Sequence, residues 1–356
     1  MKSRTCLLLG IGCLVAAQGV SSFWCKPQRG ELTPNRDVYE ALTPGELAGT
    51  LMLGGFRGLA CDLLWLRADS AKENGRFYES VALFEAISRI QPRFEQPWQF
   101  MSWDLAYNLS HEVEDRDAKW SWIIAGIDTN IRGVTRNPQS ERLLRHLAWM
   151  FHHKGDLFHD KIEQVAWAAR INPVLTEVNA RVKPGYQVEL LPAGTGISNF
   201  TLSSRLYQAC IALADGALDG KGWLSAQFVR RMVPLALESD GNLKRNQSHH
   251  LDALKRYLDA LQAWDGVIAW AHLPSSNPGE ISQRKISLDS VERNEGRLRR
   301  KAAQYCYDLA PDSDTAEKTA QAILARNWSE ALRQLQRPGW KTAASNARIH
   351  WLDEPG

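Results

Sequence analysis

The chain has 356 residues, of which 44% are hydrophobic and 23% are charged. This balance is typical of a globular protein and excludes a chain that is disordered throughout. The formal net charge is +3, which is too small to favour nucleic acid or an anionic membrane as a partner. Because 356 residues exceed what one compact core usually holds, we expect two subdomains or one extended repeat array.

The N-terminus has the pattern of a secretory signal. Two basic residues precede the apolar run Cys6–Val20, and small serines follow it. The run has about 15 residues, fewer than the ~20 needed to span a bilayer. We therefore expect residues 1–24 to be a cleaved signal peptide or a membrane anchor, and residues 25–44 to be a spacer. Either alternative places the protein outside the cytoplasm, in the periplasm or anchored to the inner membrane.

A long helix is expected to begin at Thr43-Pro44, with threonine as its cap and proline at its first position. Arg57 and Asp62 stand in its middle and would each cost roughly 2.5–3.5 kcal/mol in a bilayer, so we do not expect this helix to cross a membrane. Two stripes at helical spacing predict a helix packed on two sides. One stripe is aliphatic or aromatic and the other mostly small: Met52, Phe56, Leu59, Leu63 and Leu66, against Gly54, Gly58, Cys61 and Trp65.

Residues 64–98 predict a helix hairpin, with a break at Asn74-Gly75 and a stop at Pro92. Further helices are expected over residues 97–113, 119–134, 140–153 and 160–171. Prolines 92, 138 and 173 each follow the second helix of a pair, at intervals of 46 and 35 residues. Proline blocks continuation of a helix, and a two-helix period near 34 residues is typical of tetratricopeptide repeats.

One unit carries residues close to the characteristic positions of that repeat: Leu147-Ala148, Phe151, Gly155-Asp156 and Pro173. The chain therefore resembles degenerate tetratricopeptide repeats. Over roughly residues 45–175 it is also similar to a family of uncharacterised, exported bacterial helical-repeat proteins, in the segments GGFRGLACDLLWLRADSAKENGR, IQPRF, WDLAYN and LAWMFHHKGD. The resemblance implies an all-α, tetratricopeptide-like helix-hairpin array (an α-solenoid) over residues 45–173 and an exported location. It implies no particular chemistry.

The second half is expected to begin with a loop-rich insertion at residues 174–204, which contains a short strand at Tyr186–Leu191 and faces a partner. After it we expect a helical continuation at 205–273, a linker at 274–285, C-terminal helical hairpins at 286–338 and a tail at 339–356.

The sequence contains no phosphate-binding loop, nucleophile elbow or paired-cysteine metal motif. One cluster of imidazoles and carboxylates could ligate zinc or iron: His146, His152, His153, Asp156, His159 and Asp160. An expected turn at Gly155-Asp156 would split this cluster between two helices, so we predict no metal and no cofactor. The four cysteines beyond the predicted signal are expected to be isolated buried thiols, although three pairings are open to them.

Two functions remain. The first is a non-enzymatic scaffold for protein–protein interaction in the cell envelope, without catalytic residues. Its expected contact residues are Trp103, Tyr107, Asn108, Trp149 and Tyr186. The alternative is a glycan-processing all-α enzyme with a tryptophan-lined cleft, since the chain has 14 tryptophans. Such an enzyme needs two carboxylates across the cleft, for which Asp104 and either Glu112 or Asp265 are the candidates.

Overall fold

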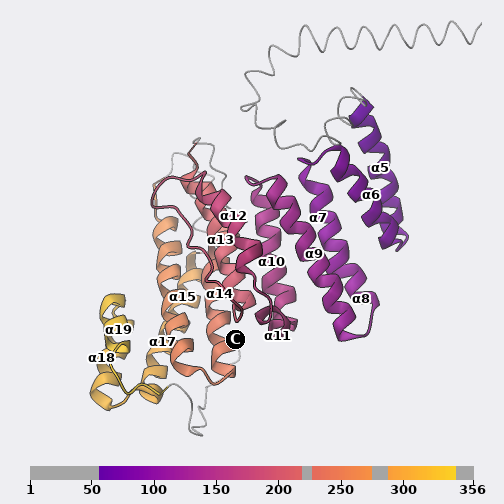
Figure 1. The fold of residues 1–356 in the computed structure, drawn as a ribbon. Coiled ribbons are helices and arrows are strands. Elements are labelled where there is room, and N and C mark those ends of the chain that lie inside the picture. Colours follow the sequence, from indigo (N-terminus) through magenta and orange to yellow (C-terminus); the bar gives the residue numbers. More distant parts are fainter. Residues whose placement is uncertain (1–55, 219–226, 275–287, 342–356) are drawn as a thin grey trace, which may run out of the picture. The chain divides into compact units, whose positions relative to one another are not determined.

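The structure is a computed structural model that describes residues 56–218, 227–274 and 288–341. All regular structure in these ranges is helical, which confirms the all-α prediction. The chain divides into two compact units, Met1–Met101 and Ser102–Gly356 (Figure 1). The predicted signal or anchor, the spacer and nearly all of the predicted linker and tail lie outside the described residues. Among the described helices, none is both long enough and apolar enough to cross a membrane.

The first unit contains helices α5 (Phe56–Glu73) and α6 (Phe77–Ile90) and most of α7 (Glu95–Trp103). Gly75 joins α5 to α6 with a positive φ of 71°, a conformation that glycine adopts without strain, so the predicted hairpin break is confirmed. The end of α6 before Pro92 is confirmed as well. The half-buried Trp65 ring packs among three phenylalanine rings centred 5.2–5.5 Å away, the buried Phe84 and the half-buried Phe94 and Phe100.

The prediction that the first helix is packed on two sides is wrong for the part described. The face of α5 that meets α6 buries small side chains, Cys61, Ala68 and Ala71, which allow the two helices to approach closely. The large apolar side chains of the other stripe are 52–67% exposed: Phe56, Leu59, Leu63 and Leu66. Helical periodicity identified the stripe, but periodicity does not say what covers it.

The second unit begins with a π-helix, η2 (Asp104–Leu109), followed by α8 (Ser110–Glu112), α9 (Arg116–Arg136) and α10 (Glu141–Leu157). The Ser140 side chain accepts a hydrogen bond from the Leu143 N–H and caps α10, as the sequence predicted. Helix α9 ends one residue before Asn137-Pro138, which is also as predicted. Gly126 lets α9 lie against the end of α7 and the start of η2, because an added Cβ would be only 2.7 Å from the Ser102 carbonyl oxygen and 2.8 Å from the Ala106 Cβ.

Helix α10 does not break at Gly155-Asp156 but continues to Leu157, so the predicted turn comes two residues later, at Phe158, before α11 begins. Gly155 has a packing role instead, since an added Cβ would lie 2.6 Å from the Asn199 Cβ. The predicted helix stop at Pro173 is wrong. The chain forms a short α11 (His159–Glu163), turns, and starts α12 (Ala168–Asn179) afresh, which places Pro173 in the second turn of α12. The insertion therefore begins after Asn179 rather than at residue 174.

The buried ring of Trp167 explains that turn. Its Nε1–H donates to the Ile162 carbonyl 2.9 Å away, which stabilises the chain reversal between α11 and α12. Because the helix restarts at Ala168, Pro173 removes only one helical hydrogen bond, at an exposed position where water can replace it. The proline intervals are therefore not a reliable record of repeat ends.

The rest of the second unit consists of α13 (Asn199–Gly216), α14 (Gln227–Asn246), α15 (His250–Ala271), α17 (Leu288–Leu309), α18 (Ser313–Leu324) and α19 (Trp328–Leu335). Helices α13, α14, α15 and α17 pack in series in chain order, and α10 packs against α13 (Figure 1). The core between them contains large buried rings, Tyr207, Tyr257, Trp264 and Tyr305.

Candidate functional site

A groove over α13, α14 and α15 combines apolar and charged side chains in one concave feature. It consists of two adjoining hollows with volumes of ≈ 470 and ≈ 460 Å³. Both are bordered by Glu189, Arg205, Gln208 and Ala263, so they form one elongated depression, called the α13–α15 groove below. Clefts of this size that join an apolar wall to a few polar groups are the usual binding sites of proteins.

One end of the groove is apolar. Ile211 of α13, Val233 of α14 and Val267 of α15 line it, together with Val188 of the insertion. Val188, Val233 and Val267 are largely buried, so their side chains form a fixed wall that a partner's apolar side chain can contact. Arg230 lies beside this end, with its guanidinium 4.4 Å from the centre of the Trp270 ring.

The other end of the groove is charged. Arg205 pairs with Glu189 and donates to the Gln208 side chain at 3.2 Å. Arg256 donates to Asp259 at 3.1 Å and to the fully buried carboxylate of Asp240 at 2.8 Å. Burial raises the pKa of Asp259, and the neighbouring Arg256 opposes that effect. Both charge signs are therefore held in place at this end.

The insertion after α12 forms one wall of the groove, and two asparagines hold it. Asn179 accepts from the Val188 N–H and donates to the Val188 carbonyl, both at 2.7 Å. Asn172 does the same to Leu191, at 2.8 and 2.9 Å. The predicted strand at Tyr186–Leu191 is wrong, because asparagine side chains of a helix replace the neighbouring strand that would complete a ladder.

Tyr186, an expected contact residue, lies at the apolar end of the groove and is 43% exposed. Its ring packs over Gly216, where an added Cβ would overlap it. An isolated bridge between Val182 and Ala217 fixes the start of the same segment. The insertion is therefore anchored along its length, and Tyr186 presents only one side to solvent.

Three of the other expected contact residues lie together, Trp103 at the end of α7, Tyr107 on η2 and Trp149 on α10. Trp103 stacks on Tyr107 with a 4.0 Å centroid distance, and Tyr107 in turn stacks on His153 at 5.7 Å. His153 stacks on Trp149 at 5.3 Å, which completes a row of four nearly parallel rings. The Lys154 ammonium lies 4.6 Å from the Tyr107 centroid. We call Trp103, Tyr107, His153 and Trp149 the aromatic row.

The aromatic row includes residues in and next to the π-helix η2, where the backbone departs from regular α-helix. Trp103 directly precedes the π-helix, a conformation frequent at functional sites, and is 38% exposed. Asn108, the remaining expected contact residue, donates to the buried Asp104 carboxylate at 2.6 Å, so it supports η2 rather than facing a partner freely. Burial raises the pKa of Tyr107 well above its ordinary value, so its hydroxyl is neutral. The row offers ring faces rather than reactive groups.

The imidazoles beside the row belong to a packed helix face. His146, His152 and His153 all lie on α10, and burial lowers the pKa of His146 to about 4. The described residues contain no group of three or more potential ligands that could hold a metal ion. Cys61, Cys210 and Cys306 are buried free thiols, as expected, whereas Cys25 lies outside the described residues.

Two of the three carboxylates considered for glycan chemistry, Asp104 and Asp265, have structural partners. Asp104 is fully buried in η2. Asp265 accepts from the Trp328 Nε1–H at 2.7 Å and pairs with Arg326 at 3.4 Å. Glu112 ends the one-turn helix α8 and is exposed. None of the three borders the α13–α15 groove.

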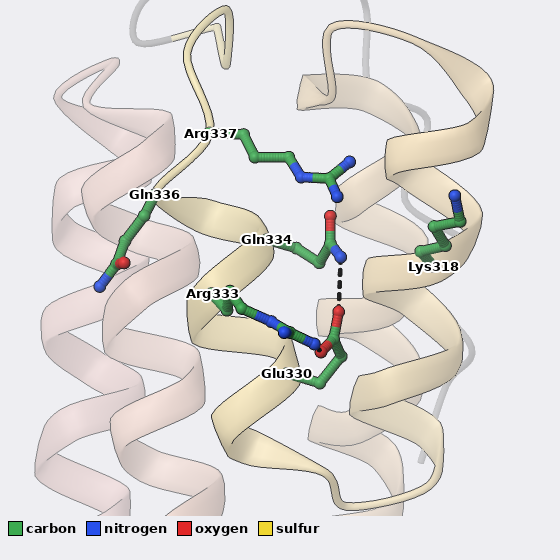
Figure 2. A pocket seen from close by; sticks show the side chains of 6 residues that line it. All are labelled: Lys318, Glu330, Arg333, Gln334, Gln336 and Arg337. Carbon is green, nitrogen blue, oxygen red and sulfur yellow. Dashed lines mark hydrogen bonds and ion pairs between the residues drawn. The ribbon is translucent and has the colours of Figure 1, made fainter.

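A third hollow, of ≈ 500 Å³, lies on the C-terminal hairpin (Figure 2). Its lining side chains come from α18, α19 and the turn that follows, and all are long and polar. Glu330 is paired with Arg333 and also accepts from Gln334, so three of the hollow's six lining side chains bond one another. With no apolar wall, it is a weaker candidate than the groove.

Comparison of the chain with protein-family models, with curated proteins and with solved structures finds no match. The site must therefore be judged on its own geometry. Sequence reasoning identified Tyr186 but missed Arg205 and Ile211 of α13 and Val267 of α15, because residues of two helices more than 50 positions apart form no local motif. One signal was available: Asn172 and Asn179 are seven residues apart, which places both on one helix face.

Proposed function

We propose that this protein is an exported, non-enzymatic scaffold of the cell envelope, built of degenerate tetratricopeptide-like hairpins. Its α13–α15 groove would bind an extended segment of a partner protein. The observation that carries the proposal is the groove itself, with fixed apolar side chains at one end and both charge signs at the other. Such a surface suits a peptide that carries an apolar anchor a few residues from a charged one.

The insertion supports an extended ligand in particular. Residues Val188–Leu191 already lie extended on α12, and bidentate asparagine bonds hold their backbone. Helical-repeat surfaces that bind extended peptides need the same kind of backbone recognition, because side-chain pockets alone leave peptide N–H and C=O groups unpaired. The aromatic row would provide a second contact area, since large rigid rings are frequent among residues that dominate interface energies.

Site-specific photocrosslinking in the native envelope tests the groove. A photoreactive residue would replace Gln208, which borders both hollows, and a matched control would replace Gln321, an exposed residue of α18. We expect Gln208 to give a discrete crosslinked protein that Gln321 does not. An added Ile211→Arg change, which places a charge at the apolar end, should abolish that product. Identical products from both positions, or a product that Ile211→Arg leaves unchanged, would contradict a groove-bound partner.

Export is tested separately, because a groove can bind a partner in any compartment. Residues 1–40 would be fused to a reporter enzyme that is active only outside the cytoplasm. We expect an active reporter, and loss of activity when charged residues interrupt the apolar run Cys6–Val20. An inactive fusion that is expressed at the same level would contradict the proposed location while leaving the groove untouched.

A further inference from the structure

The exposed stripe of α5 has a spacing that points to a particular occupant. Phe56, Leu59, Leu63 and Leu66 follow one another at intervals of three, four and three residues, and each is more than half exposed. These intervals are those of positions a and d in a heptad repeat, the seam of a coiled coil. Met52 precedes Phe56 by four residues in the sequence and continues the spacing, although it lies outside the described residues.

The charges beside the stripe agree with this register. When Phe56 is position a, Asp62 falls at position g and Arg67 at the following position e, and both are exposed. Arg67 also pairs with Glu79 of α6 at 2.9 Å, which holds its guanidinium beside the seam within each chain. In a parallel pair of helices, position g of one chain faces the next position e of the other, so Asp62 of each copy meets Arg67 of its partner. In an antiparallel pair, g faces g, and Asp62 and Asp69 would bring like charges together. The charges therefore favour the parallel arrangement.

We propose that α5 pairs with α5 of a second copy of this chain, as a short parallel two-stranded coil. This interface is independent of the α13–α15 groove and of its proposed partner. It lies on the face of α5 opposite the one that α6 covers through Cys61, Ala68 and Ala71. Because α6 already packs against α5 within each chain, α5 is folded before the two copies associate. Its 18 residues are therefore enough for a coiled-coil contact, whereas an isolated coiled coil needs about three or four heptads.

A membrane surface is the competing occupant of an apolar helix face. Helices that lie on membranes are typically rich in lysine and arginine on their polar face. Helix α5 instead has three basic and three acidic residues, Arg57, Arg67 and Lys72 against Asp62, Asp69 and Glu73. This helix lacks the excess of basic residues that an anionic membrane surface attracts, and its Asp62–Arg67 pair at positions g and e suits a second copy of the same sequence, so a second copy is favoured.

Cysteine crosslinking of the full chain in mild detergent tests both the contact and its direction. In a parallel coil each seam residue lies opposite its own copy, so Leu59→Cys and Leu66→Cys should each give a disulfide-linked dimer on mild oxidation. The matched control is Tyr78→Cys, at an exposed position of α6 outside the seam. The unsubstituted chain measures the background from its own six cysteines. Dimer from both seam variants, above both controls, is the expected result.

Sedimentation in the same detergent measures the strength of association. A short seam of this kind predicts a Kd on the order of micromolar, and Leu63→Asp should raise it at least about tenfold because a charge would enter the seam. Leu63 is exposed in the single chain, so this variant should keep its helical circular dichroism. A monomer at tens of micromolar would overturn the proposal. Crosslinking from only one seam position would overturn the parallel arrangement, and partition of monomers into vesicles through the stripe would assign the face to lipid.

Discussion

The two asparagines of α12 allow a quantitative test of how the groove wall is held. Asn179→Ala removes both hydrogen bonds to Val188 and leaves its N–H and carbonyl without those partners, although Val188 is only 7% exposed. A hydrogen bond of this kind contributes about 1 kcal/mol net. The free energy for local opening of the wall should therefore fall by about 2 kcal/mol.

Amide hydrogen exchange measures that opening directly. Since each 1.4 kcal/mol corresponds to a factor of ten, a loss of about 2 kcal/mol predicts roughly 30-fold faster exchange at the Val188 N–H. Asn172→Ala should act in the same way on Leu191, which it holds at 2.8 and 2.9 Å. Amides in the buried centre of α15 should keep their exchange rates in both variants, because the wall opens locally.

Glu177→Ala is the matched control, since Glu177 is an exposed residue of the same helix whose side chain pairs with Arg181 and not with the insertion. It should leave the Val188 exchange rate unchanged. Unaltered exchange at Val188 in Asn179→Ala would show that packing, rather than the asparagine bonds, holds the wall. Equal acceleration by the Glu177→Ala control would show that α12 as a whole had been destabilised.

Three further predictions concern stability. Burial holds the pKa of His146 at about 4, below its ordinary ~6.5, so unfolding takes up a proton at pH values between these two. The free energy of unfolding should therefore fall by about 3 kcal/mol as the pH drops from ~6.5 to 4. Denaturant titrations of His146→Gln should show a flatter pH dependence of this free energy, and the same dependence as in the unsubstituted chain would refute the role of His146. Gly126→Ala should lower the free energy of unfolding by about 1–3 kcal/mol, because the added Cβ would lie 2.7 Å from the Ser102 carbonyl oxygen. Gly266→Ala on α15 has open space around the added Cβ and should raise the free energy of unfolding by up to ~1 kcal/mol, because alanine favours a helix more than glycine does. Thermal melts that rank the two variants the other way would contradict this packing. Asp240→Asn replaces a fully buried carboxylate that accepts from Ser198 and pairs with Arg256, and it should lower the free energy of unfolding by about 3 kcal/mol. The exposed Asp252→Asn should lower it by less than ~0.5 kcal/mol. Similar denaturation midpoints for the two variants would contradict a stabilising role for the Ser198–Asp240–Arg256 interactions.

Features that depend on neighbouring residues could be read from the sequence. The hairpin at Gly75, the Ser140 cap and the end of α9 before Pro138 each follow from interactions within about one helical turn. The all-α class follows in the same way, because helical periodicity recurs along the described chain. Local rules failed at Pro173, where burial of the Trp167 ring moved the start of the helix and made proline tolerable inside it.

Tertiary structure alone decided which faces meet. The stripe of α5 has the same periodicity whether it is buried or exposed, so only the position of α6 showed that Leu63 and Leu66 face outward. The groove likewise depends on pairs far apart in the chain, such as Ser198 with Asp240 and Asn172 with Leu191. Sequence spacing specifies the direction of a side chain on its own helix, but the partner it meets is set by the packing of whole helices, which no local pattern encodes.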